Sequence, residues 1–303
     1  MGYANLSQCL ADLEAQGQLK RVDAELDPYL ELAAVQRRAF RAKAPALLFT
    51  RVKGTRFPML ANLFGTHERL RYIFRDSLRA VDAVLAAKAD PMAALRRPWR
   101  SLPALPGLVH MLPRVKRVQG RDGGRGGRAP VLECSCNLAD LPRLTCWPRD
   151  GGPFITLPLV YTEDPDRPGL NASNLGMYRV QLAGNAYAPD EAGLHYQIHR
   201  GIGVHHAHAL AQGRELPVHV YVGGPPALSV AAVMPLPEGL SELRFAGLLG
   251  GRRMALARCP GLRLPVLAEA DFCISGRLVP ELKPEGPFGD HVGYYSLRHE
   301  IGR

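Results

Sequence analysis

The sequence lacks the features that mark a membrane protein or a disulfide-rich secreted protein. No apolar run approaches the roughly 18 uncharged residues that a membrane-spanning helix needs, and residues 1–12 lack the basic start and apolar core of a secretion signal. The six cysteines include no CxxC spacing, so neither a zinc ribbon nor a disulfide framework is indicated. We therefore expect a cytoplasmic protein with reduced thiols and no transmembrane segment. The closest cysteine pair, Cys134 and Cys136, is interpreted as ordinary thiols in a strand.

Aromatic residues are few, at 7%, and acidic residues are outnumbered by basic ones, which gives a net charge of +10. Net charge speaks to solubility and long-range attraction and does not identify a partner. A basic, glycine-rich tract covers residues 120–128. Such a tract can bind RNA, but a single short one between folded segments is more often a solvated linker. We expect no nucleic-acid partner.

Apolar residues make up 47% of the 303 positions, enough to fill a sizeable core. Hydrophobic periodicity and turn residues define the expected elements. Helices are expected from Leu6 to the Gly17 stop and over 30–43, within 67–88, and over 194–211 and 241–249; strands are expected over 19–22, 46–49, 58–62, 154–161, 218–222, 227–233 and 266–272.

These elements predict an α+β protein with two parts. The first part, residues 1–115, has the pattern of a small N-terminal α/β domain. The second, residues 116–303, has many short strands and few helices, which favours a barrel or sandwich with helical insertions.

Three segments concentrate polar side chains that a purely structural domain does not need. They are Asn-Leu-Gly-Met-Tyr-Arg at 174–179, His-Tyr-Gln-Ile-His-Arg-Gly at 195–201 and Glu-Gly-Pro-Phe-Gly-Asp-His at 285–291. Taken singly, each has an ordinary explanation. Asn174 can form a turn, His195 or His199 can be a hydrogen-bonded core histidine, and Glu285 and Asp290 can be solvated loop carboxylates.

Taken together, the three segments resemble the UbiD decarboxylases, of the 3-octaprenyl-4-hydroxybenzoate carboxy-lyase type. Cys-Trp-Pro-Arg-Asp-Gly-Gly-Pro-Phe-Ile-Thr at 146–156, Gly-Gly-Pro-Pro-Ala at 223–227 and Pro-Glu-Gly-Leu-Ser-Glu at 237–242 extend the match in the same order. The resemblance implies a split β-barrel flavin-binding domain after the N-terminal domain. It also implies reversible, non-oxidative decarboxylation of an aromatic or α,β-unsaturated acid, with prenylated FMN and a divalent metal, as in ubiquinone biosynthesis.

The resemblance also implies a ligand set for the cofactors. Manganese would be bound by Asn174, Glu242 and His199, with His195 as the alternative histidine, and potassium by Glu242 with carbonyls near residues 231 and 234. An amide, an imidazole and a carboxylate suit a hard octahedral ion better than structural zinc. The flavin would be lined by Met177, Tyr178, Arg179, His195, Tyr196, Gln197, Arg200 and Gly201. The other histidines of this region, His205, His206 and His208, are expected to be structural or exposed.

Loss of CO2 from an unsaturated carbon requires an electron sink, which is the task of the flavin. Arg179 is expected to bind the substrate carboxylate through its guanidinium fork, and Asp290 is expected to act as the general acid. The resemblance to the family implies that Arg179 also pairs with Glu285. The two carboxyls are five positions apart in one loop, and neighbouring carboxyls tend to titrate separately.

The implied partners are a carboxylic acid substrate, a flavin prenyltransferase that supplies the cofactor, and further copies of the chain in a homo-oligomer. Family members usually continue into a C-terminal domain, whereas this sequence stops at Arg303. The alternatives are therefore a non-catalytic flavin-binding fragment or one part of a split decarboxylase.

Overall fold

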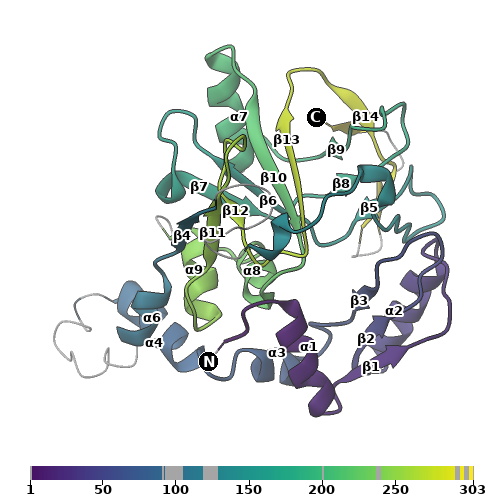
Figure 1. Ribbon diagram of the computed structural model, residues 1–303, viewed down its shortest axis with the longest axis horizontal. Coiled ribbons are helices and arrows are strands. Elements are labelled where there is room, and N and C mark those ends of the chain that lie inside the picture. Colours follow the sequence, from purple (N-terminus) through teal and green to yellow (C-terminus); the bar gives the residue numbers. More distant parts are fainter. Residues whose placement is uncertain are drawn as a thin grey trace.

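The computed structural model describes residues 2–90, 92, 105–118, 129–199, 201–236, 240–290, 294–296 and 300–302. The first part of the chain contains α1 (Leu6–Ala15), β1 (Leu19–Val22), α2 (Glu31–Arg41), β2 (Ala46–Phe49), β3 (Met59–Ala61), α3 (His67–Ile73), α4 (Leu78–Ala89), α6 (Leu105–His110) and β4 (Arg114–Arg117). Figure 1 shows the helices and β1–β3 along the lower side of the molecule, whereas β4 lies beside β11 of the second part, with which it pairs.

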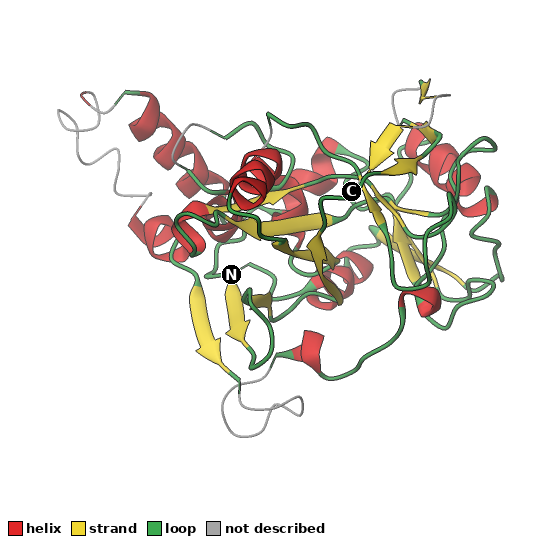
Figure 2. Ribbon diagram, turned by 90° about the horizontal axis from the view of Figure 1, so that it is seen from above, coloured by secondary structure: helices red, strands yellow, loops and turns green. Residues whose placement is uncertain are grey.

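The second part contains β5 (Phe154–Ile155), β6 (Leu159–Glu163), β7 (Ser173–Gly176), β8 (Val180–Gln181), β9 (Gly193–Leu194), α7 (Gly201–Ala211), β10 (Leu216–Val222), α8 (Pro226–Ala231), α9 (Glu242–Leu249), β11 (Ala255–Arg258), β12 (Val266–Leu267), β13 (Phe272–Leu278), β14 (Lys283–Glu285), β15 (Phe288–Gly289), β16 (Tyr295–Ser296) and β17 (Glu300–Gly302). In the described part of the chain, single-turn 3-10 helices lie at Pro130–Leu132, Leu138–Asp140 and Leu170–Ala172. The turned view in Figure 2 shows helices distributed around the strands. The expected α+β class is confirmed.

The N-terminal elements follow the predicted pattern closely. The side chain of Asn5 accepts a hydrogen bond from the Gln8 N–H and so starts α1, and β1, β2 and β3 form one sheet in that order. Leu13 and Leu19 are buried in the same large core cluster as Leu159 and Leu243 of the second part. The two parts therefore share a hydrophobic core.

The sheet that positions the candidate site has the strand order β13-β10-β6-β7. Strand side chains alternate between the two faces of a sheet. On β6, Leu159 and Tyr161 belong to the large cluster with α8 and α9, whereas Val160 belongs to a second cluster with Ile202 and Ala209 of α7. The sheet is thus a middle layer between α8 and α9 on one face and α7 on the other.

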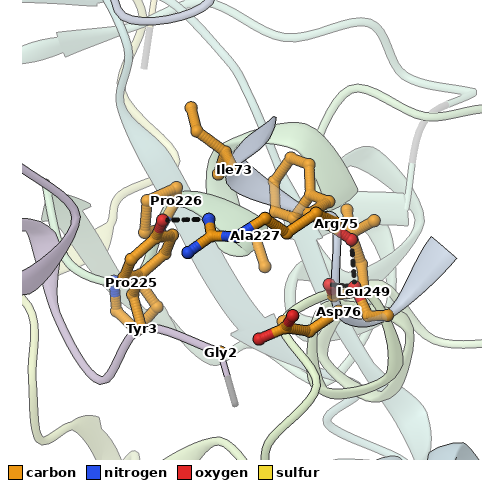
Figure 3. Close-up of a pocket in the computed structure, with 12 residues that line it drawn as sticks. Gly2, Tyr3, Ile73, Arg75, Asp76, Pro225, Pro226, Ala227 and Leu249 are labelled. Carbon is orange, nitrogen blue, oxygen red and sulfur yellow. Dashed lines mark hydrogen bonds between the residues drawn. The ribbon is translucent and has the colours of Figure 1, made fainter. Parts of the chain in front are cut away.

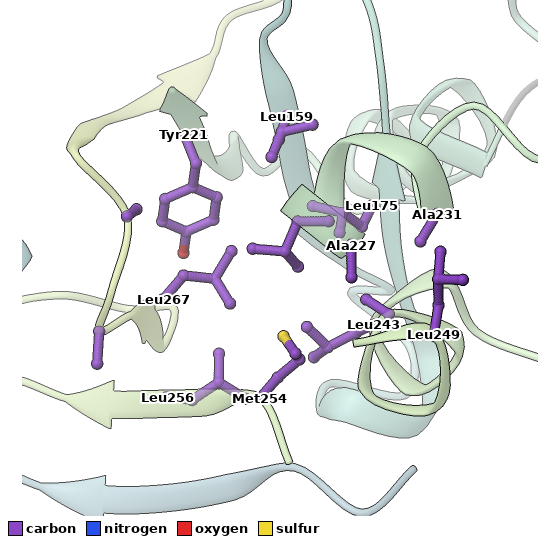
Figure 4. Packing of buried hydrophobic residues seen from close by; sticks show 14 of the residues in the cluster. Leu159, Leu175, Tyr221, Ala227, Ala231, Leu243, Leu249, Met254, Leu256 and Leu267 are labelled. Carbon is purple, nitrogen blue, oxygen red and sulfur yellow. The ribbon is translucent and has the colours of Figure 1, made fainter. Parts of the chain in front are cut away.

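The large cluster fills the space between this sheet, α8, α9 and the β11–β12 pair (Figure 4). Leu159 and Leu175 reach into it from the sheet, and Leu243 reaches into it from α9. Tyr221 is fully buried there, and its hydroxyl donates a hydrogen bond to the Pro265 carbonyl at 2.9 Å. Because its hydroxyl has an acceptor, the Tyr221 ring can pack in the core without leaving an unsatisfied polar group.

The strand predicted over 227–233 is wrong, because residues Pro226–Ala231 form α8. A short, wholly apolar run cannot be assigned to helix or strand by periodicity. Here Pro226, which is suited to the first helical turn, and the helix-forming Ala227 and Ala231 favour the helix. The helix predicted over 194–211 begins only at Gly201, and Leu194 instead belongs to β9.

The cysteines are free thiols, as expected, but Cys134 and Cys136 lie in exposed irregular chain and not in a strand. Within the described ranges, no helix has both the length and the apolar character that crossing a membrane requires. The glycine-rich tract at 120–128 lies outside the described residues.

The buried His219 gives the fold an acid-sensitive point. Burial lowers its pKa to about 4, below the value of about 6.5 expected in the unfolded chain. The unfolded state therefore binds the proton more strongly, and the free energy of unfolding should fall as the pH drops from about 6.5 to 4, by about 3 kcal/mol at most.

Urea titrations between pH 4 and 8 test this expectation. The variant His219→Gln should lose most of the decline, whereas His67→Gln, at an exposed position, should retain it. Equal acid sensitivity in wild type and His219→Gln would show that another group is responsible.

Candidate active site

A buried ion pair lies at the centre of the candidate site. Arg179 directly precedes β8 and Glu285 ends β14. The guanidinium Nε lies 2.9 Å from Glu285 Oε1, and Nη2 lies 2.7 Å from Oε2. The Glu285 side chain is fully buried and that of Arg179 is 19% exposed. The Arg179 guanidinium also lies 4.8 Å from the centroid of the Phe288 ring. The predicted pairing of these two residues is therefore present, in the two-pronged geometry that arginine and carboxylate favour.

His195 lies beside the same carboxylate. Strands β8 and β9 pair antiparallel, and just past them the backbone N–H of His195 donates to the carbonyl of Arg179 at 3.3 Å. The His195 Nδ1 lies 3.9 Å from Glu285 Oε2. The structure thus places this histidine with the ion pair.

The loop that follows Glu285 is held by two amide side chains, those of the buried Gln181 and the half-buried Asn185. Gln181 Oε1 accepts from the Gly286 N–H at 2.9 Å, and its amide donates to the carbonyls of Gly151 and Ala183. Asn185 Nδ2 donates to the Gly286 carbonyl at 2.6 Å. Sequence reasoning missed Gln181 and Asn185, because nothing local distinguishes a buried amide that meets a distant loop from an exposed one. Gln181 lies two positions after Arg179, and residues two apart on a strand face the same side. This spacing is the one sequence signal that could have placed Gln181 beside Arg179.

Glu242 lies against the backbone of β7 at the residue that follows Asn174. Asn174 lies on β7, and the Ser241 cap starts α9 so that Glu242 falls in its first turn. Glu242 Oε2 accepts a hydrogen bond from the backbone N–H of Leu175, the residue after Asn174, at 3.4 Å. Burial raises the pKa of Glu242, and two backbone N–H groups partly offset this effect. The Glu242 carboxylate is therefore held next to the strand that carries Asn174.

Gly201, the first residue of α7, lies against Asn174. A methyl group at Gly201 would lie 2.2 Å from Asn174 Oδ1, so any larger residue at this position would displace the Asn174 amide. The amide nitrogen of Asn174 is buried and has no hydrogen-bond partner among the described residues. The oxygen and nitrogen of an amide exchange places by a flip, so this position can offer an acceptor to a cation or a donor to an anion.

Two further predicted residues, Gln197 and His199, are not joined to this constellation by any hydrogen bond or ion pair within the described residues. His199 and Gln197 are exposed on the irregular segment between β9 and α7, and the imidazole of His199 contacts neither Asn174 nor Glu242 through a hydrogen bond or ion pair in the described part of the chain. Asp290 is half-buried, and its backbone N–H donates to the Tyr294 carbonyl. Arg200 lies outside the described residues.

The predicted flavin-lining aromatic residues pack close to the sheet. Tyr178 and Tyr196 lie against the α7 cluster, and Met177 lies against the large cluster. The Tyr196 hydroxyl forms a hydrogen bond with Nδ1 of His206, which is buried on α7. His206 therefore has a structural role, as expected.

The remaining helix histidines also make structural contacts. His205 is buried, and its Nδ1 lies 2.9 Å from the Thr162 hydroxyl. His208 Nδ1 lies 3.1 Å from Asp164 and 3.2 Å from Asp166. Because these groups bond one another, the cluster is explained as an ion-pair network.

A surface pocket lies away from all of these residues. It is bounded by the N-terminal segment, the chain between α3 and α4, and the start of α8 (Figure 3), and none of the predicted site residues lines it. Arg75 donates to the Tyr3 hydroxyl across it at 2.9 Å. Burial and the hydrogen bond with Asp12 raise the pKa of Tyr3, which keeps this phenol neutral.

Comparisons with known families agree with the arrangement. Residues 125–301 match the model of the 3-octaprenyl-4-hydroxybenzoate carboxy-lyase Rift-related domain, and residues 10–88 match the model of the N-terminal domain of the same enzyme. The chain belongs to the UbiD family.

Among curated proteins, a Chlamydia pneumoniae protein named as one of the subunits of a 4-hydroxybenzoate decarboxylase is 42% identical over 292 residues, which are 95% of this chain and 47% of that protein. An uncharacterized protein of Chlamydia muridarum is 38% identical over 95% of this chain and 48% of its own length. The chain thus spans about half the length of the curated relatives it matches.

Two solved structures show the same fold. The UbiD-class enzyme HmfF of Pelotomaculum thermopropionicum, in complex with FMN, is 28% identical with a TM-score of 0.74, over 98% of this chain and 60% of that chain. The vanillic acid decarboxylase of Sedimentibacter hydroxybenzoicus in closed form is 26% identical with a TM-score of 0.77, over 100% of this chain and 60% of that chain.

The contact between Gly201 and Asn174 generates a stability prediction. Alanine is the better helix former, yet Gly201→Ala should lower the free energy of unfolding by about 1–3 kcal/mol, because its methyl group collides with the Asn174 amide. Urea unfolding measures the change. Gly276→Ala on β13, where the added methyl group meets open space, should be nearly neutral. Equal stability of the two variants would contradict the proposed crowding.

Proposed function

We propose that this chain carries the prenylated-FMN and metal site of a decarboxylase that removes CO2, reversibly, from an aromatic or α,β-unsaturated carboxylic acid. The observation that carries the proposal is the buried Arg179–Glu285 pair, which unites two polar segments 106 residues apart. Family membership agrees with it. A related HmfF structure is described in complex with prFMN.

The residues around Asn174 suit a divalent cation and the phosphate of a flavin. Amide and carboxylate oxygens are ligands that hard cations such as Mn²⁺ prefer. The N-terminus of α7 begins at Gly201, directly beside Asn174, and helix N-termini attract anions through their free N–H groups. We assign Asn174 and Glu242 as metal ligands, with His199 as the third. We propose potassium beside Glu242, near the carbonyls of Ala231 and Met234.

The flavin, when bound, supplies the electron sink for the carbon that loses CO2. The chain's own groups orient the acid and move a proton. Arg179 presents a fixed cation toward the substrate carboxylate while Glu285 holds the guanidinium fork in place. Asp290 returns a proton to the carbon that has lost CO2. His195, at 3.9 Å from Glu285, completes the polar lining.

The flavin is proposed to lie against the chain between β7 and α7. The lining residues are Met177, Tyr178, Arg179, His195, Tyr196, Gln197, Arg200 and Gly201. A flavin prenyltransferase would supply it in the cytoplasm.

The related structures include a dimeric HmfF and the two-subunit vanillic acid decarboxylase, and we propose that this chain also forms a homo-oligomer. The domain boundary near residue 115 belongs to the same proposal.

The catalytic roles predict a separation of CO2 release from flavin binding. The test uses the chain co-expressed with a flavin prenyltransferase and offered hydroxybenzoic and acrylic acids. Arg179→Lys keeps the charge but loses the fork, and Glu285→Gln loses the partner charge. Each should lower the rate of CO2 release at least about 100-fold while the absorbance of bound flavin is retained.

The matched control is Arg277→Lys, an exposed arginine on β13 whose ion pair is with Glu215; it should keep full activity. Normal turnover in both site variants would refute the assigned roles. Bound flavin with no turnover in the wild type would favour a non-catalytic fragment, or one part of a split decarboxylase.

The metal assignment predicts a loss of cation affinity that is independent of turnover. Glu242→Gln removes a carboxylate ligand and should weaken Mn²⁺ binding, measured by electron paramagnetic resonance titration, at least about tenfold, which corresponds to roughly 1.4 kcal/mol. Glu215→Gln, in an exposed ion pair, should bind Mn²⁺ as the wild type does. Unchanged affinity in Glu242→Gln would remove this residue from the ligand set.

A further inference from the structure

The two carboxyl groups of the candidate site are separated by a loop whose backbone is anchored on both sides. Gly286 is bound through both its N–H and its carbonyl by Gln181 and Asn185. The Pro287 carbonyl accepts from the Gly151 N–H at 2.7 Å. Gly289, the residue before Asp290, donates its N–H to Asp150 Oδ1 at 2.8 Å. Asp150 is thus the charged side chain that anchors the loop next to Asp290.

The Asp150 carboxylate joins this loop to a turn in a different part of the sequence. Its second oxygen, Oδ2, accepts hydrogen bonds from the backbone N–H groups of Trp147 at 2.9 Å and Cys146 at 3.2 Å. Both oxygens therefore act as acceptors for backbone donors, one facing the turn and the other facing Gly289. Bonds from backbone N–H groups to a carboxylate are charge-assisted and stronger than neutral ones.

The Trp147 side chain packs against Gly289, the glycine that Asp150 binds. A methyl group at Gly289 would lie 2.2 Å from the indole Cδ1, so the ring lies directly against the loop backbone. The Arg37 guanidinium of α2 lies 4.7 Å from the Trp147 ring centroid on its face and donates to the Cys146 carbonyl at 3.3 Å. Such stacking fixes the orientation of the indole. The turn at 146–150 is therefore braced from the N-terminal elements.

We propose that Asp150 is a positioning residue that fixes Gly289, and with it Asp290, at a set distance from Glu285. The inference rests on the proposed function, in which Glu285 supports Arg179 and Asp290 donates the proton. Proton transfer depends steeply on geometry, and a misplacement of about 1 Å can cost about 100-fold in rate. Asp150 itself acts through the loop and does not touch the substrate.

The donors on both sides of the carboxylate explain why an aspartate is needed. Asparagine has the same size, but one of its two terminal atoms is an NH2 group. In one flip state this group faces the N–H groups of Cys146 and Trp147, and in the other it faces that of Gly289. Asparagine would therefore lose either the hydrogen bonds from Cys146 and Trp147 or the hydrogen bond from Gly289.

The test compares Asp150→Asn with Asp150→Glu and with a matched control, Asp140→Asn. Asp140 also accepts a hydrogen bond from a backbone N–H in a nearby turn, that of Asn137 at 2.9 Å. Within the described part of the chain it has no hydrogen bond to the loop at 286–290. CO2 release per bound flavin is measured for the flavin-loaded chain. Asp150→Asn should lower kcat about 10- to 100-fold with KM changed less than about threefold. Asp150→Glu, which keeps two acceptor oxygens, should recover at least about tenfold of that loss.

A second measurement does not require turnover. In protein labelled with ¹⁵N-glycine, amide exchange at Gly289 should accelerate at least about tenfold in Asp150→Asn and remain unchanged in Asp140→Asn, because local opening controls exchange. If the wild type releases no CO2, the proposed function fails, and accelerated exchange at Gly289 still supports Asp150 as the anchor of the loop. Unchanged exchange at Gly289, or an unchanged kcat in an active enzyme, would overturn the inference.

Discussion

The structure of the site depends on keeping one carboxylate, Glu285, charged in a fully buried position. Removing a charge from water costs several kcal/mol unless a partner and hydrogen bonds replace the lost hydration. Arg179 donates hydrogen bonds to both carboxylate oxygens, and His195 lies next to Oε2. The pair forms only if the start of β8 and the end of β14 meet, so the chain must fix both. The amide anchors of Gln181 and Asn185 and the carboxylate of Asp150 serve this requirement.

The middle sheet determines where the second half of the site lies. Because neighbouring residues of a strand face opposite sides, burying Leu175 against α9 turns Asn174 toward the start of α7. The Leu175 N–H then binds Glu242 at the beginning of α9. One strand thus connects the two helices around the candidate metal position, and the apolar packing of the sheet sets the polar geometry.

Much of this arrangement could be predicted from the sequence, for identifiable reasons. Strands β1 and β2 and helix α9 have clear periodicity and turn or cap residues at their ends, and the motifs around Arg179 and Glu285 identified the ion pair. The error at α8 arose because a buried helix and a buried strand share an apolar pattern. Gln181 and Asp150 could not be found as anchors, since the loop N–H groups that they bind, those of Gly286 and Gly289, lie more than a hundred positions away in the sequence. The roles of His199 and Asp290 stay predictions.

The common core of the two parts has a consequence for how the protein loses its structure. Leu13 and Leu19 pack in the same cluster as Leu159 and Leu243, so melting the first unit would expose apolar surface of the second. Arg37 on α2 likewise packs on the Trp147 indole, which lies against Gly289 in the loop after Glu285. Denaturation should therefore be one cooperative transition in which the ion pair and the N-terminal sheet disappear together. An exchange of N-terminal units between relatives would preserve the site only where the facing leucines and the Arg37–Trp147 contact are matched.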